Sequence, residues 1–158
     1  MEPRGQVIKA MALIRRPRDG ALLVSAETNP DGSPFHRPLG GHVEFGEYAL
    51  DTVRREFQEE IGQALTDVRL AGVLENIFQW GGATQHEVVF IFTAGFADAA
   101  AYQIAEQTIL DLRDITRVIW RAADAAGPPL YPTGVAALAA RTGIRSRTLR
   151  PASGQAPG

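Results

Sequence analysis

Apolar positions along the first part of the chain predict two strands followed by a loop. Val7 to Ile14 is an almost continuous apolar run, which is typical of a mostly buried strand. A turn at Arg18-Asp19-Gly20 follows, and Asp-Gly is a strong hairpin signal. Ala21 to Ala26 is then expected to return as the second strand of a hairpin. Residues 28–38 are rich in Asn, Pro, Asp, Gly and Ser, which predicts a loop.

The clearest helical repeat lies between Tyr48 and Ile61. Its charged residues fall on one face, and apolar residues recur every fourth position on another, at Ala49, Val53, Phe57 and Ile61. Gly62 stands directly after this repeat, where glycine often ends a helix. The segment therefore predicts an amphipathic helix that buries one face.

The second half of the chain predicts further strands and a short helix. Val68 to Phe78 and Glu87 to Phe96 are expected to be strands on either side of a turn at residues 80–82. Arg117 to Arg121 predicts a short strand, and Gly134 to Thr142 a short alanine-rich helix. Because strands and helices interleave, the expected class is α/β or α+β with a mixed sheet.

Length and composition predict one domain without a membrane segment. The 158 residues are 45% apolar and 22% charged, which leaves room for one sizeable core. We expect the domain to cover residues 1–143, and residues 144–158, rich in Arg, Ser, Pro and Gly, to form a disordered tail. No stretch approaches the roughly 20 apolar residues of a membrane span, and no signal peptide is visible. A cytoplasmic protein is therefore expected.

Charge and cysteine content exclude several classes of function. The formal net charge of −2 offers no basic field for duplex DNA or an anionic membrane. An acidic site can still bind a polyphosphate when divalent cations lie between the two. The absence of cysteine excludes disulfide scaffolds, thiolate zinc sites and cysteine nucleophiles. Lys9 is the only lysine among 16 basic residues, which together with abundant alanine indicates a base-composition bias rather than a function.

Three carboxylates on the central helix form the first candidate site. Glu56, Glu59 and Glu60 are spaced so that all three lie on one side of the helix, about one turn apart. Such like charges repel by about 0.2–0.5 kcal/mol per pair on an isolated helix. A cation among them removes this repulsion, and an all-oxygen ligand set favours Mg²⁺ or Mn²⁺ over zinc. Taken alone, the helix fits a solvated acidic face, partly neutralised by Arg54 and Arg55, at least as well.

The residues before the helix favour the metal site. Residues 39–47 (Leu-Gly-Gly-His-Val-Glu-Phe-Gly-Glu) place paired glycines, a third glycine and another carboxylate directly before it. Glycine allows close approach of the backbone, so a main-chain carbonyl can point into a metal site.

The whole segment from Gly41 to Gln63 resembles the Nudix box. Phe57 fills the apolar slot of that pattern, and every fixed position is present at the required spacing: Gly41, Glu47, Arg55, Glu56, Glu59, Glu60 and Gly62. Only the last slot departs, because an aliphatic residue is usual there and this chain has Gln63. The resemblance implies a Nudix-type α/β/α sandwich with a mixed β-sheet over roughly residues 6–142. Residues 35–41 and 74–78 are similar to a bacterial MutT-like branch.

The resemblance also implies roles for the residues of the box. Glu59 and Glu60 are the expected metal ligands, together with the main-chain carbonyl of Gly40. Glu56 is either a third ligand or the residue that activates water, and family members differ in which carboxylate is the base. The catalytic candidates are Glu56, Glu59 and Arg55, the arginine orienting a glutamate of the box. The implied cofactor is Mg²⁺ or Mn²⁺, which activates water and clamps phosphate oxygens.

Supporting residues and substrate contacts are expected in and around the box. Glu47 is expected to support the start of the helix and, like Glu59, is a candidate partner for Arg55. The candidate substrate contacts are Arg37, His42, Trp80 and Glu87. Each also has a plainer interpretation, as an exposed loop side chain, a turn aromatic or a strand-end charge. Further carboxylates, expected to be loop charges, are Glu106, Asp111 and Asp114.

The leading functional hypothesis is Mg²⁺-dependent hydrolysis of a phosphoanhydride bond in a nucleoside diphosphate linked to a group X. A MutT-like nucleoside triphosphate pyrophosphatase is its leading version. The alternatives are a nucleotide-sugar or dinucleoside polyphosphate pyrophosphatase, an RNA 5′-end pyrophosphohydrolase and a non-catalytic nucleotide-binding module. The implied partner is a small nucleotide, and a homodimer through the apolar hairpin strands remains open.

Overall fold

The computed structural model describes residues 5–111, 114–124 and 126–148. Within these residues the chain forms eight strands, two α-helices and one short 3₁₀ helix. In chain order they are β1 (Val7–Ile14), β2 (Leu22–Thr28), β3 (Pro34–Arg37), β4 (Leu39–His42), α1 (Ala49–Ile61), β5 (Leu65–Trp80), β6 (Ala83–Phe96), η1 (Ala99–Gln103), β7 (Glu106–Asp111), β8 (Asp114–Arg121) and α2 (Val135–Thr148).

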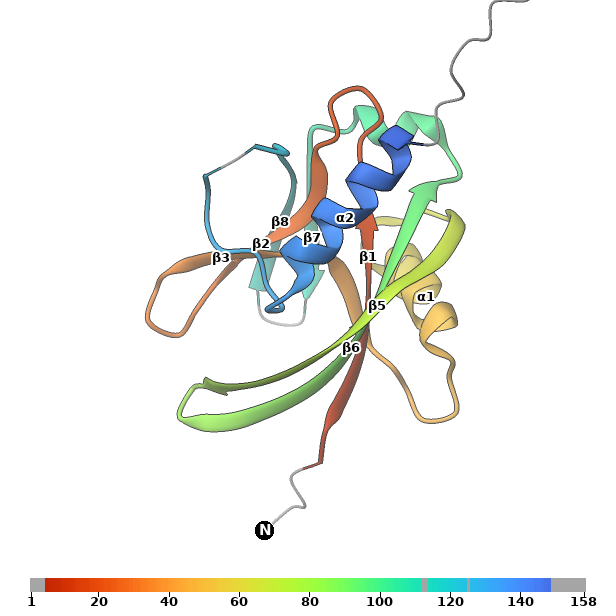
Figure 1. The fold of residues 1–158 in the computed structure, drawn as a ribbon. Coiled ribbons are helices and arrows are strands. Elements are labelled where there is room, and N and C mark those ends of the chain that lie inside the picture. Colours follow the sequence, from red (N-terminus) through yellow and green to blue (C-terminus); the bar gives the residue numbers. More distant parts are fainter. Residues whose placement is uncertain (1–4, 112–113, 125, 149–158) are drawn as a thin grey trace, which may run out of the picture.

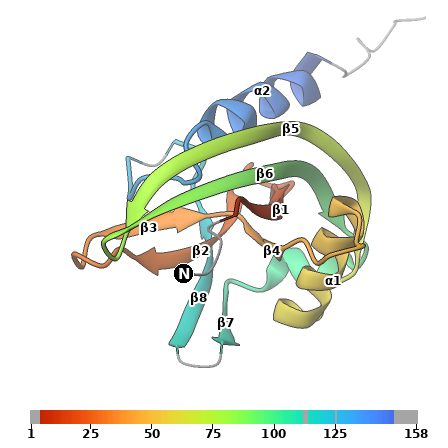
Figure 2. The ribbon, with the colours of Figure 1, turned by 90° about the horizontal axis from the view of Figure 1, so that it is seen from below.

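The strands form two sheets of four strands, which lie between the two helices. One sheet has the order β4-β1-β6-β5 and the other β3-β2-β8-β7. β1 pairs antiparallel with β4 and parallel with β6, so the first sheet is mixed. In Figure 2, α2 lies outside the curved β5–β6 ribbon and α1 lies beneath it. The predicted α/β/α sandwich with a mixed sheet is confirmed.

Alternate side chains of β1 serve the two halves of the core. Ala10 and Ala12 pack in a cluster that includes Phe57 of α1, while Met11 and Leu13 pack in a second cluster with Leu138 of α2. Successive residues of a strand point to opposite faces, so one apolar strand supplies both clusters. This explains why Val7 to Ile14 is apolar almost throughout rather than at every second position.

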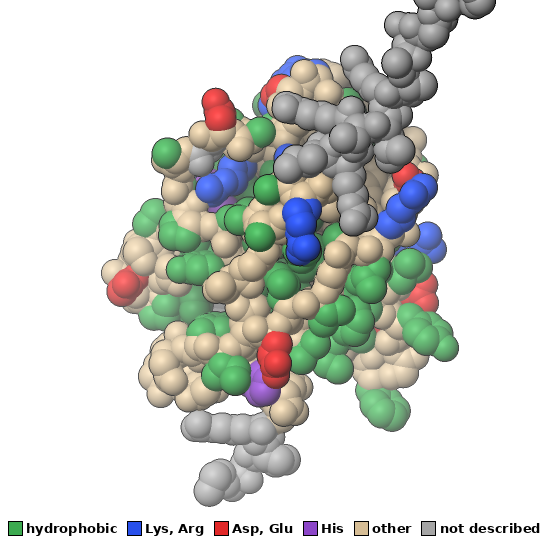
Figure 3. All heavy atoms as spheres, in the orientation of Figure 1, with side chains coloured by type: hydrophobic (Ala, Val, Ile, Leu, Met, Phe, Trp, Pro, Cys, Tyr) green, Lys and Arg blue, Asp and Glu red, His purple; other side chains and the backbone are tan. Residues whose placement is uncertain are grey.

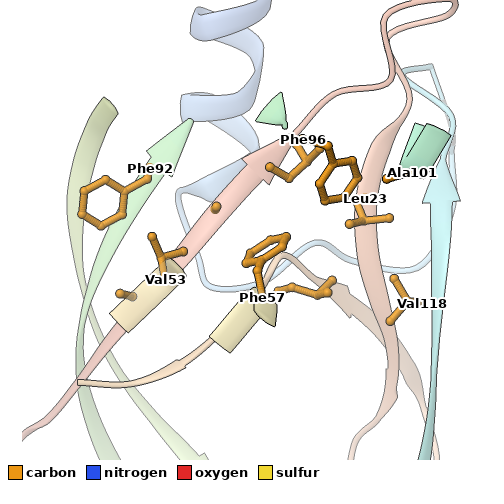
Figure 4. Packing of buried hydrophobic residues seen from close by; sticks show 11 residues of the cluster. Leu23, Val53, Phe57, Phe92, Phe96, Ala101 and Val118 are labelled. Atoms are coloured by element: carbon orange, nitrogen blue, oxygen red, sulfur yellow. The ribbon is translucent and has the colours of Figure 1, made fainter. Parts of the chain in front are cut away.

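The apolar face of α1 fixes the position of its acidic face. Val53 and Phe57 are fully buried, and the Phe57 ring lies against Phe96 with 6.4 Å between ring centroids (Figure 4). Burial of a large apolar side chain contributes about 1.5–3 kcal/mol. Gly62 ends the helix in the left-handed conformation, with φ of 67°, as the sequence predicted. The helix is thereby held beside β4, with its carboxylates toward that strand.

The predicted hairpin between the first two strands is wrong, although both strands and the turn exist. β1 and β2 lie in different sheets and share only the bridge between Arg15 and Leu22. A strand has two hydrogen-bonding edges, and those of β1 are already used by β4 and β6. The turn at residues 16–20 therefore carries the chain from one sheet to the other (Figure 1).

Three short strands lie where the sequence predicted loops. β3 lies within residues 28–38, β4 contains the paired glycines, and β7 together with the start of β8 contains the predicted loop charges. Each becomes a strand through a partner distant in sequence or across a tight turn, and none shows alternation of its own. The strands of the β5–β6 hairpin are longer than predicted, and α2 continues beyond Gly143 to Thr148.

Candidate functional site

The paired glycines of β4 lie between β1 and the acidic face of α1. A Cβ atom on Gly40 would lie 2.0 Å from the carbonyl oxygen of Ala10, so this position must lack a side chain for β4 to pair with β1. A Cβ on Gly41 would lie 2.4 Å from the carboxylate of Glu56. The Glu56 side chain, only 16% exposed, is thus packed directly against backbone. The two glycines serve different purposes. Gly40 allows β4 to pair with β1, and Gly41 leaves space for the Glu56 carboxylate.

Alanine substitution is expected to separate these two purposes. Gly40→Ala meets fixed backbone and should destabilise the protein by about 1–3 kcal/mol, as overpacking does. Gly41→Ala meets only the movable end of Glu56, so it should leave the melting temperature nearly unchanged and lower the activity of the candidate site about tenfold. Thermal unfolding and steady-state kinetics of both variants test this. Equal losses of stability in the two variants would contradict it.

Arg55 connects the carboxylates at the beginning and in the middle of α1. Its guanidinium donates to both carboxylate oxygens of Glu47, from Nε at 2.8 Å and Nη2 at 3.0 Å. Nη1 donates to Glu56 at 3.0 Å and to Glu59 at 3.2 Å. Nη2 also donates to the carbonyl oxygen of His42 at 3.2 Å. One planar cation therefore sets the positions of three glutamates and ties them to β4.

Glu47 supports the turn that leads into α1. Besides Arg55, it accepts a hydrogen bond from the Thr52 hydroxyl at 2.5 Å and one from the Glu44 backbone N–H at 3.3 Å. The hydrogen bonds from Arg55 and Thr52 lower the pKa of Glu47 from 4.5 to about 2. This carboxylate therefore stays charged through the physiological range, in the supporting role that the sequence indicated.

The carboxylates of α1 line a cavity of about 420 Å³ together with the glycines of β4. Its predicted members come from two elements: Gly40, Gly41, Glu56, Glu59 and Glu60. The donor set fits a hard divalent ion, because it is made of carboxylate oxygens and backbone. In the arrangement described for these residues, no three His, Asp or Glu side chains converge as metal ligands, and Arg55 contacts both Glu56 and Glu59.

A second cavity of about 550 Å³ adjoins the first, and we call it the aromatic chamber. The two cavities share four lining residues: Lys9, Met11, Arg37 and His42. The aromatic side chains on the chamber wall are Phe35, Phe78, Trp80 and Tyr131. The centroid of the Phe35 ring lies 6.0 Å from that of Trp80, with the two rings nearly perpendicular, and 5.5 Å from that of Tyr131. The chamber therefore combines aromatic rings, against which a planar group can pack, with polar side chains such as Asn76 and Gln85.

All four predicted substrate contacts line the aromatic chamber: Arg37, His42, Trp80 and Glu87. Glu87 lies within β6, where the sequence analysis placed it at the end of a strand, and it pairs with Lys9 at 2.6 Å. Arg37 pairs with Glu27 at 3.3 Å. Lys9, which lines both cavities, was not predicted from the sequence, although a charged residue within an apolar strand was an available signal.

Of the other carboxylate candidates, Glu106 and Asp114 have described side chains, and neither lines either cavity. Glu106 pairs with Arg117 across the β7–β8 hairpin, and Asp114 is exposed. Asp111 ends β7, but its side chain lies outside the described residues. Among the described side chains of this hairpin, Ile109 and Thr116 line the acidic cavity.

Exposed apolar side chains gather on β5, the outermost strand of its sheet. Leu70, Val73 and Ile77 are each at least half exposed, and Figure 3 shows hydrophobic side chains grouped over this strand. The homodimer prediction did not name this surface, and it stays a prediction. Among the described residues, no helix is both long and apolar enough to cross a membrane.

Comparison with known proteins gives a family match and a set of similar structures. A family model described as the NUDIX domain matches residues 5–135. A MutT NUDIX hydrolase from Burkholderia pseudomallei is 26% identical, with a TM-score of 0.63 over 85% of this chain and 96% of that chain. No curated protein matches.

Two further solved structures resemble the chain in fold alone. The MutT protein from Methanosarcina mazei Go1 is 18% identical, with a TM-score of 0.59 over 93% of this chain and 99% of that one. An ADP-ribose pyrophosphatase from Streptococcus suis 89-1591 is 16% identical, with a TM-score of 0.56 over 88% and 92%. Their shared fold spans most of the chain.

Proposed function

The chain belongs to the NUDIX family of hydrolases, and from this premise we propose that it cleaves a phosphoanhydride bond in a nucleoside diphosphate linked to a group X. A MutT-like nucleoside triphosphate pyrophosphatase that uses Mg²⁺ or Mn²⁺ is the leading version. The observation that carries the proposal is the meeting of the acidic cavity with the aromatic chamber. The two parts of a nucleotide match these two cavities. Its polyphosphate can bind to carboxylates through divalent cations, and its planar base can pack against aromatic rings.

The proposed metal ligands are Glu56, Glu59 and Glu60, with the carbonyl of Gly40. When bound, the metal supplies charge neutralisation for the phosphates and a water of lowered pKa. Arg55 positions Glu56 and Glu59 and must release or share their oxygens with the ion. Glu56 is the proposed proton acceptor, since Gly41 and Arg55 hold its carboxylate in one place.

The proposed substrate contacts lie where the two cavities meet and beyond. Arg37 and His42 line both cavities, so they are placed to contact phosphates that extend from the carboxylates toward the chamber. Trp80 packs nearly perpendicular to Phe35 and is 40% exposed, so part of its ring is available for a base to pack against. The Arg37 guanidinium also pairs with Glu27, which limits the directions it can take.

A substrate panel tests the proposed function. Nucleoside triphosphates, including oxidised ones, nucleotide sugars, dinucleoside polyphosphates and 5′-triphosphorylated RNA are each incubated with Mg²⁺ or Mn²⁺. We expect at least one class to release pyrophosphate, or a nucleoside monophosphate with a second phosphorylated product. A chelator should return the rate to background. If the folded protein hydrolysed no member of the panel with either ion, the proposed function would be wrong.

A further inference from the structure

Lys9 lies at the border that the acidic cavity and the aromatic chamber share, and we call this border the passage. It lines both cavities, and it is the only lysine of the chain. The alternation of β1 places Lys9 on the same side as Met11, the side that faces the cavities. Lys9 therefore places a cation at the passage between the acidic cavity and the aromatic chamber.

The Lys9 ammonium is held in the passage by a largely buried carboxylate. It lies 2.6 Å from Glu87, and the two side chains are only 14% and 12% exposed. Removing both charges from water is costly, and two apolar residues of similar volume would often be as stable or more stable. The fold alone therefore gives little reason for this pair, which leaves room for a role in binding.

A second ion pair, whose cation comes from the other sheet, lies at the same passage. Arg37 extends from β3, in the other sheet, and pairs with Glu27. Arg37 also lines both cavities, as Lys9 does. Glu87 lines the chamber but is not among the residues around the acidic cavity. The passage is therefore bordered by two cations from two sheets, each held by a carboxylate that a phosphate can replace as partner.

We propose that Lys9 binds the phosphate nearest the sugar and is a specificity-determining residue for the polyphosphate chain. The inference rests on the proposed function. A substrate whose outer phosphates lie at the carboxylates of α1 and whose base lies among the aromatic rings must pass Lys9 with its innermost phosphate. Glu87 holds the ammonium in place in the free protein and releases it, wholly or in part, when the phosphate arrives.

The single lysine makes the first test direct. Protein grown with lysine labelled with ¹³C at Cε gives one lysine Cε signal, which reports on Lys9 without any modification. The probe is a nucleoside triphosphate with a methylene bridge between the α- and β-phosphorus atoms, added with Mg²⁺. We expect the signal to move and to saturate at the concentration at which calorimetry shows binding. A signal that stays in place at saturation overturns the inference.

Kinetics of matched variants give the second test. Lys9→Met should raise KM about tenfold, which corresponds to about 1.4 kcal/mol, while kcat stays within about threefold. Lys9→Arg keeps the charge and should restore most of the loss. The double variant Lys9→Met with Glu87→Met leaves no buried charge unpaired, so it keeps the test valid if Lys9→Met alone fails to fold. An unchanged KM in these methionine variants contradicts the proposal.

The two proposals fail in distinguishable ways. If the panel yields a substrate but Lys9 neither shifts nor changes KM, the function stands and the role of Lys9 is wrong. If the panel yields none, the function fails, and the titration with the methylene-bridged nucleotide still decides whether Lys9 contacts a bound phosphate.

Discussion

Replacing Glu59 or Glu60 with glutamine is expected to lower kcat/KM at least about 100-fold, because loss of a metal ligand forfeits several kcal/mol of transition-state stabilisation. Glutamine keeps the size of the side chain and removes its charge, so the change acts on ligation rather than packing. Both residues line the acidic cavity, whereas Phe57 of the same helix is buried in the core. The measurement is steady-state hydrolysis of the best substrate of the panel over a Mg²⁺ titration.

Asp51→Asn is the matched control for these variants. Asp51 lies in the first turn of the same helix, is exposed and does not line the acidic cavity, so the same loss of charge should leave activity close to wild type. Melting temperatures of all three variants should lie close to wild type, since no core contact changes. If Glu59→Gln and Glu60→Gln were as active as Asp51→Asn, the assignment of the metal ligands would be wrong.

Local features of the sequence predicted the helix and the acidic face well. The apolar repeat of α1 and the glycine that ends it are set by residues within a few turns of each other, so a pattern in the chain is enough to reveal them. The same holds for the turn at Gly81-Gly82, where two glycines with positive φ join β5 to β6.

Pairing between distant strands was not predictable from the same patterns. The Asp19-Gly20 turn has the residues of a hairpin, yet the sheet gives β1 other partners, and β6 lies beside it in parallel. β4 looks like a glycine-rich loop because its strand character comes from pairing with β1 and not from its side chains. A turn signal fixes local backbone shape and leaves the choice of partner to the rest of the fold.

The candidate site likewise has one part that was predictable from local sequence and one part that depends on distant strand pairing. Arg55, Glu56 and Glu59 are neighbours on one helix, so their spacing alone brought them together. Lys9 and Glu87 are far apart in sequence and meet only because β1 and β6 pair in parallel. The metal ligands and the base remain predictions, as does a domain boundary near residue 143.

Replacing Arg55 with alanine is expected to lower kcat about 100-fold, the second largest effect after loss of a metal ligand. Glu56 and Glu59 would lose the hydrogen-bond donor that they share, and Glu47 would lose its bidentate contact with the guanidinium. A general base that is no longer held in position loses much of its typical 10²–10⁴-fold contribution. Arg55→Lys should recover little of the lost activity, because a lysine ammonium cannot make the planar, bidentate contact of a guanidinium.

The pH dependence of the melting temperature shows how Arg55→Ala affects stability, separately from its effect on kcat. In the wild type the pKa of Glu47 falls from 4.5 to about 2, chiefly through Arg55, so its stabilising contribution is complete above pH 4.5 and is lost as pH falls toward 2. Without Arg55 the pKa of Glu47 returns toward its ordinary value. The melting temperature of Arg55→Ala should therefore lie below wild type at pH 7, and the gap should narrow as pH falls through this range.

Arg54→Ala serves as the control for Arg55→Ala, because Arg54 is the exposed neighbour on the same helix and lines neither cavity. Arg54→Ala should keep wild-type activity, and its difference in melting temperature from wild type should not narrow as pH falls. Arg55→Glu adds a like charge beside Glu47, Glu56 and Glu59 and should be less stable than Arg55→Ala at pH 7. If instead Arg55→Ala kept full activity and a pH-independent gap in melting temperature, Arg55 would be an ordinary surface arginine, and Glu56 would need another residue to position it.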